Sequence, residues 1–212
     1  MASYGVSSGD DRGMVGSTLA PRLGAIGAVR VCLGSRSARA VASVVGCCLL
    51  MTLGARVRVA IPWTDVPMTL QLLAVLLIGF SLEPALALGG MLTYLACGTA
   101  GLPVFTAGSL GLPGPTGGYL VGFVLAAWVV SNLRGGRAAG VGRLLLAGVT
   151  GVASVLVPGV LWHAAFVGGD VWLSVDMALV PFVPKAVVEL LLAVTLVTSA
   201  HRTRRRGWCS GE

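Results

Sequence analysis

Polar, proline-rich and glycine-rich pieces stand between strongly apolar segments in the stretch from Val59 to Phe123. The stretch reads VAIPWTDVPMTLQ, then an apolar segment, then LTYLACGTAGLPVF and GPTGGYLVGF. A membrane protein tolerates irregular polar backbone at lipid depth where that backbone lines a cavity or is covered by protein. The sequence therefore predicts a membrane chain built around a pocket for a small polar molecule.

The composition supports a membrane location. Hydrophobic residues make up 56% of the 212 residues and charged residues 11%, whereas about a quarter of a soluble domain is charged. At about 20 apolar residues per crossing, the chain has room for roughly six helices in one domain. We therefore expect an all-α, polytopic membrane protein, a bundle of six transmembrane helices with irregular outer loops.

Six apolar segments separated by proline, glycine or charge mark the expected helices. They cover 38–55, 68–82, 85–97, 117–133, 144–166 and 177–200. The alternation of Val57, Val59 and Ile61 predicts a short extended segment after the first helix. Pro84 suits the first turn of the third helix.

The remaining segments are expected to be loops and tails. Residues 98–116 read as an uncharged outer loop, and 168–176 as a short acidic loop. We expect 1–37 to be a cytoplasmic, largely disordered extension, 38–200 the membrane domain, and 201–212 a basic cytoplasmic tail.

The placement of the positive charges predicts the orientation. Arginines cluster before the first expected helix, between the fourth and the fifth, and after the sixth. Because arginine beside a membrane span marks the cytoplasmic side, both termini are expected there, and a nucleic-acid partner is not. Arg56 and Arg58 fall on the outer side, so we expect the pocket or a folded loop to hold them.

Three side chains at span ends are candidates for holding a polar ligand. Thr69 and Gln71 open the second expected helix, and Tyr94 lies late in the third. Their hydroxyl and amide groups can hydrogen-bond a ligand, although bonds between helices are the alternative.

Phe105, Gly117 and Tyr119 lie in or beside the outer loop. The two aromatic residues are either interfacial anchors or pocket lining. Gly117 belongs to GLPGPTGGY, which lacks the lysine of a phosphate-binding loop. Its glycines instead suit tight turns and a close backbone approach at the pocket mouth.

Lys185 and Glu189 lie four residues apart, on one face of the sixth expected helix. Ionisable groups inside a span are costly unless they are paired or face a cavity, so we include both in the candidate site. A structural ion pair, or a lysine that reaches the interface, is the alternative.

Gly34, Ala38, Ala42 and Gly46 form a stripe of small residues at helical spacing. Such a stripe allows another helix to approach closely in lipid. It serves either packing within the chain's own bundle or docking to another membrane subunit.

Neither a metal site nor an enzyme is expected. None of the five cysteines forms a C-x-x-C pair, and no histidine stands at zinc-ligand spacing. His163 has no evident partner in the sequence, so an intramembrane enzyme that uses it is the weakest interpretation.

IPWTDVPMTLQLLAVLL, LTYLACGTAGLPVF and GPTGGYLVGF, in this order, resemble the BioY family, the substrate-binding subunits of energy-coupling-factor biotin transporters. The resemblance covers roughly 38–200 and implies a six-helix fold in a prokaryotic cell membrane. It implies that the chain binds biotin for uptake, carries no cofactor and catalyses no reaction. Implied partners are a membrane coupling subunit and two cytoplasmic ATPases, with docking through the small-residue stripe.

The chain departs from the family pattern Pro-x-Asp-x-x-Lys at the start of the sixth helix. Counted from Pro184, Ala186 stands at the aspartate position and Glu189 at the lysine position, with Lys185 just before. Lys185 or Arg56 is expected to meet the biotin carboxylate, and Glu189, Gln71 or Tyr94 the ureido group. The shifted charges keep another vitamin or precursor open as the ligand.

Overall fold

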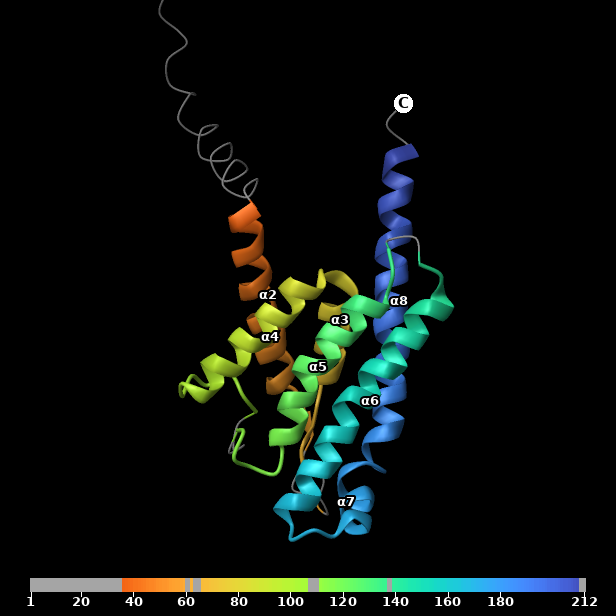
Figure 1. The fold of residues 1–212 in the computed structure, drawn as a ribbon. Coiled ribbons are helices and arrows are strands. Elements are labelled where there is room, and N and C mark those ends of the chain that lie inside the picture. Colours follow the sequence, from red (N-terminus) through yellow and green to blue (C-terminus); the bar gives the residue numbers. More distant parts are fainter. Residues whose placement is uncertain (1–35, 60–61, 63–65, 107–110, 137–138, 210–212) are drawn as a thin grey trace, which may run out of the picture. The chain divides into compact units, whose positions relative to one another are not determined.

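The structure is a computed structural model that describes residues 36–59, 62, 66–106, 111–136 and 139–209, with the backbone alone over 204–209. Expectations for 1–35, which include Gly34, lie outside the described residues. The described chain is mostly helical (Figure 1). Its elements are α2 (Arg36–Arg56), β1 (Arg58–Val59), β2 (Met68–Thr69), α3 (Gln71–Ser81), α4 (Pro84–Thr99), α5 (Gly117–Leu133), α6 (Val141–Phe166), α7 (Val171–Ala178) and α8 (Phe182–Cys209).

Three of the described helices are long and apolar enough to cross a membrane: α2, α6 and the Phe182–Thr203 part of α8. The apolar helices α3, α4 and α5 are shorter, with 11, 16 and 17 residues. The mostly helical fold confirms the expected class at this level. The number of membrane crossings stays a prediction.

The expected second helix begins too early in the chain. Met68 and Thr69 form β2, which pairs antiparallel with β1, so that Arg58 faces Thr69. The extended segment predicted after the first helix thus has a partner strand, and α3 begins only at Gln71. The start of the next helix agrees with expectation, since Pro84 is the first residue of α4.

The expected acidic loop contains a helix, α7. Asp170 precedes it, and its carboxylate accepts a hydrogen bond of 2.9 Å from the backbone N–H of Leu173. Such a cap satisfies an amide that would otherwise be unpaired at the helix start. Because α7 extends to Ala178, the last helix begins at Phe182 and not at Met177 as expected.

Glycines set the spacing of α5 and α6, which make the most extensive helix contact in the described chain. A Cβ atom at Gly118 would lie 2.3 Å from the carbonyl oxygen of Pro158, and one at Gly122 would lie 2.8 Å from Cα of Val155. Figure 1 shows α6 beside α5 and crossing α8, in agreement with its contacts to both. The absence of side chains at these glycines allows the close packing.

Two arginines bind carbonyl groups at the C-terminal ends of α3 and α5. These helix ends lie away from the start of α3. The Nη1 of Arg134 donates to the carbonyl oxygen of Phe80, near the end of α3, over 2.9 Å. The Nε of Arg143 donates to the carbonyl oxygen of Leu133 at the end of α5, also over 2.9 Å. Both bonds satisfy carbonyl groups that lack partners within their own helix.

Candidate binding site

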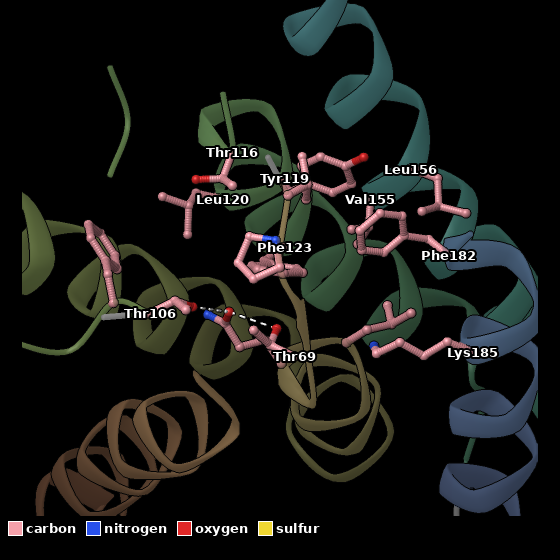
Figure 2. A pocket seen from close by; sticks show the side chains of 15 residues that line it. Thr69, Thr106, Thr116, Tyr119, Leu120, Phe123, Val155, Leu156, Phe182 and Lys185 are labelled. Atoms are coloured by element: carbon pink, nitrogen blue, oxygen red, sulfur yellow. Dashed lines mark hydrogen bonds between the residues drawn. The ribbon is translucent and has the colours of Figure 1, made fainter. Parts of the chain in front are cut away.

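A pocket lies where the first turns of α3, α5 and α8 meet the middle of α6 (Figure 2). The segment before β2 and the loop after α4 complete its wall. The lining residues are Val66, Pro67, Thr69, Gln71, Leu72, Phe105, Thr106, Thr116, Tyr119, Leu120, Phe123, Val155, Leu156, Phe182 and Lys185. The wall is therefore mostly apolar, with a few polar groups, as is typical of sites for small molecules.

Gln71 is the centre of a hydrogen-bonded polar group in this pocket. The hydroxyls of Thr69 and Thr106 both donate to its Oε1, over 3.0 and 3.3 Å. Figure 2 shows these two bonds as dashed lines from the labelled threonines. Since Gln71 is only 4% exposed, its amide is held in place within the protein.

Tyr94 fixes which way the Gln71 amide points. Its hydroxyl donates to the carbonyl oxygen of Val104 over 3.1 Å, and it accepts from Nε2 of Gln71 over 3.0 Å. Because a carbonyl oxygen can only accept, the single hydroxyl hydrogen of Tyr94 is committed to Val104. Gln71 must therefore turn its nitrogen toward Tyr94 and its oxygen toward Thr69 and Thr106.

The loop after α4 is attached at two further points. The ring of Phe105 packs edge-on against that of Tyr94, with ring centres 5.5 Å apart. Gly98 makes room for this ring, since a Cβ there would lie 2.1 Å from it. Arg56 donates from Nη2 to the carbonyl oxygen of Pro103 over 2.6 Å, in line with the expectation that the pocket or a folded loop holds it.

Lys185 is the cation on the pocket wall. Its Nζ lies 2.7 Å from Oε2 of Glu189, one turn further along α8. Glu189 is 3% exposed, and its Oε1 has no hydrogen-bond partner among the described residues. Figure 2 places Lys185 and Thr106 on opposite sides of the labelled residues. The pocket thus has two polar regions, one around Gln71 and one at Lys185.

Aromatic residues line the space between these regions. Tyr119 and Phe123 lie one turn apart on α5, and the Phe182 ring centre is 5.9 Å from that of Tyr119. The Tyr119 hydroxyl donates to the carbonyl oxygen of Ala178, at the end of α7. Such rings offer flat apolar surfaces to a ligand.

The structure brings part of the expected set together. Thr69, Gln71, Phe105, Tyr119 and Lys185 all line the pocket.

Tyr94, Gly117 and Glu189 lie behind the pocket wall. Tyr94 and Glu189 each hold a lining side chain, as described above. Gly117 is a packing position, because a Cβ there would lie 2.2 Å from the carbonyl oxygen of Leu112 and 2.9 Å from the ring of Trp162.

Several lining residues were not expected from the sequence. Phe123 follows Tyr119 by one helical turn, and Phe182 precedes Lys185 by three residues, so helical spacing gives a signal for both. Thr106, Val155 and Leu156 carry no such signal, because only tertiary packing brings them to Gln71 or to α5.

His163 has a partner that the sequence did not reveal. Its Nδ1 lies 3.0 Å from Oγ of Ser174, and both side chains are buried. The Ser174 hydroxyl donates to the carbonyl oxygen of Asp170 over 2.9 Å, so the histidine must donate to Oγ. A histidine that donates does not act as a base toward this serine, and the contact instead holds α7 against α6.

The described part of the small-residue stripe lies on α2. Ala42 and Gly46 are exposed and Ala38 is half-buried. A Cβ at Gly46 would meet no atom within 4 Å.

Known proteins resemble the chain over most of its length. A probable biotin transporter BioY of Pyrococcus horikoshii is 34% identical over 72% of this chain and 88% of its own. The biotin transporter BioY2 of Lactococcus lactis is 31% identical over 74% of this chain and 92% of its own.

The fold is also that of a solved crystal structure. The S-component for biotin from an ECF-type ABC transporter superposes with a TM-score of 0.70 at 21% identity, over 81% of this chain and 94% of that one. The model of the BioY family matches residues 29–206. This chain therefore belongs to the BioY family.

Proposed function

We propose that this chain is the substrate-binding membrane subunit of an ATP-driven vitamin importer and that its ligand is biotin. Relatives that carry the name biotin transporter support this function. The observation that carries the proposal is the ordered group of Thr69, Gln71 and Thr106 within a largely apolar pocket.

The free hydrogen-bonding capacity of this group suits a cyclic urea. The hydroxyl hydrogens of Thr69 and Thr106 are both donated to Gln71. Toward a ligand, the two hydroxyl oxygens can therefore only accept. Nε2 of Gln71 keeps one N–H after its bond to Tyr94. Two acceptors and one donor match the two N–H groups and the carbonyl oxygen of a ureido ring.

The charged region suits the carboxylate at the other end of biotin. One of the three N–H groups of Lys185 binds Glu189, which leaves two for an anion. Lys185 lines the pocket, whereas Arg56 binds the loop at Pro103, so we assign the carboxylate to Lys185. Glu189 then serves to aim the ammonium group.

The membrane arrangement follows from the helices and the arginines. We infer six crossings, made by α2, α3, α4, α5, α6 and α8, within a membrane domain over 38–200. Both termini and the basic tail over 201–212 would lie in the cytoplasm, because Arg134 and Arg143 are at the end of the bundle away from the pocket. The pocket would then open outward.

The partners we propose are a membrane coupling subunit and two cytoplasmic ATPases. The exposure of Ala42 and Gly46 supports docking through the small-residue stripe, since they are not used for packing inside the described bundle. The chain itself is a transport subunit and not an enzyme, as its transporter relatives indicate.

The small molecule that copurifies with the full chain from detergent tests the ligand. Mass spectrometry of the released fraction should detect biotin, in an amount that approaches one per chain. A Thr69→Val, Gln71→Leu variant should release far less. A different vitamin in the released fraction would instead support the alternative that the shifted charges of Lys185 and Glu189 leave open.

A further inference from the structure

The Lys185–Glu189 pair adds no net charge to its end of the ligand pocket. Nζ of Lys185 lies 2.7 Å from Oε2 of Glu189, and the two side chains carry opposite unit charges. Among the lining residues that the structure describes, Lys185 is the only charged one. The positive charge that a ligand meets there is therefore offset, one helical turn away, by a carboxylate that is 3% exposed.

The same pair offers both hydrogen-bond donors and an unused acceptor. One N–H of Lys185 binds Glu189, so two remain for a ligand. Oε1 of Glu189 is buried and has no hydrogen-bond partner among the described residues. Such an oxygen is costly, because it has lost water and has gained no donor in return. A ligand that brings a donor to Lys185 would come close to this oxygen, since both carboxylate oxygens of Glu189 are bonded to one carbon atom.

A carboxylate and a carboxamide would use this end of the pocket differently. A carboxylate can only accept, so it gains from Lys185, is repelled by Glu189, and leaves Oε1 without a donor. An amide accepts from Lys185 through its carbonyl oxygen, can donate an N–H toward Glu189, and brings no charge. A pocket end without net charge therefore gives no clear advantage to the anion.

We propose, as an extension of the biotin site proposed above, that the pocket accepts amides of biotin as well as biotin itself. Glu189 is then the residue that determines this breadth. The ligand class is biotin whose carboxyl group is joined to an amine. A lysine without a neighbouring carboxylate would instead select the free acid, because a hydrogen bond between two charged groups is the stronger one.

Equilibrium binding of biotin and of biotin carboxamide, both tritium-labelled, to the full chain in detergent at pH 7 tests this inference. The carboxyl group of free biotin is ionised there, because carboxyl groups have pKa values of about 4. We expect the unmodified chain to bind the acid no more than about threefold more tightly than the amide. Glu189→Gln removes the charge and keeps the shape, so it should prefer the acid by at least about fivefold over the amide.

Glu83→Gln is the matched control, because it removes an exposed carboxylate that precedes α4 and does not line the pocket. It should leave both affinities unchanged. Acid and amide are compared on the same variant, so a partial loss of folded protein would not change their ratio. An unmodified chain that prefers the acid beyond the expected range, or an unchanged ratio in Glu189→Gln, would overturn the inference and leave the biotin site standing. Binding of neither ligand would overturn the proposed function as well.

Discussion

At the scale of single residues, each hydrogen bond around Gln71 has one possible direction, and we propose that this determines what the pocket can recognise. Val104 can only accept, so Tyr94 donates to it and accepts from Gln71. The threonine hydroxyls then face Gln71 as donors. In the proposed site, a ligand would therefore meet a fixed arrangement of acceptors and one donor.

Thr69→Val should weaken biotin binding about fivefold, since one hydrogen bond to a ligand is worth about 1 kcal/mol. Equilibrium binding of labelled biotin to the purified chain measures the effect. Thr93→Val is the matched control, because the Thr93 hydroxyl binds the carbonyl oxygen of Gly89 in its own helix. An equal loss of affinity in both variants would contradict the assignment of Thr69.

Lys185→Met should lower thermal stability more than the double variant Lys185→Met, Glu189→Met. The single change leaves the Glu189 carboxylate buried without its cation, which costs several kcal/mol, whereas the double change removes the charge as well. Thermal unfolding in detergent compares the two, and both should bind biotin weakly. A double variant that is the less stable of the two would contradict the pairing.

At the scale of elements, the close contact of α5 and α6 depends on glycine. Gly118→Ala should destabilise the chain by about 1–3 kcal/mol, because its Cβ would meet the backbone at Pro158. Gly142→Ala, in the first turn of α6, meets no atom within 4 Å and should be neutral or slightly stabilising. Thermal unfolding of the two variants tests this order.

The sequence predicted those elements that depend on local patterns. Apolar length and the breaks at Pro84 and Gly117 placed α4 and α5 closely. Met68 pairs as a strand residue with Val59, nine residues earlier in the chain. The apolar pattern does not reveal such a partner, so the predicted second helix wrongly included Met68 and Thr69. In α7 the Asp170 cap was readable, but eight residues are too few for a periodic signal.

In the candidate site, too, residues with a local sequence signal could be predicted, and residues that only tertiary packing brings together could not. Gln71 and Lys185 could be selected because polar and ionisable groups are unusual at lipid depth, and Tyr119 because it stands beside the outer loop. Leu156 and Val155 are ordinary residues of an apolar helix, and only the packing of α6 against α5 brings them to the pocket.

At the scale of the whole molecule, the orientation in the membrane makes a separate prediction. In a chain whose native cysteines are replaced by alanine, Trp172→Cys should react with an impermeant maleimide on intact cells. Gly136→Cys should react only after permeabilisation, because it lies beside the arginines at the opposite end. Both positions are exposed in the protein. The reverse pattern would invert the proposed topology.

The affinity of the full chain for labelled biotin tests the central claim most directly. We expect the combined variant Lys185→Ala, Gln71→Ala, Tyr94→Phe to bind at least about a hundredfold more weakly, a loss of about 2.7 kcal/mol. Thr93→Val, Thr99→Val, whose hydroxyls bind their own helix, should bind as the unmodified chain does. If the combined variant remains folded and binds biotin within about twofold of the unmodified chain, this pocket is not where the vitamin is held.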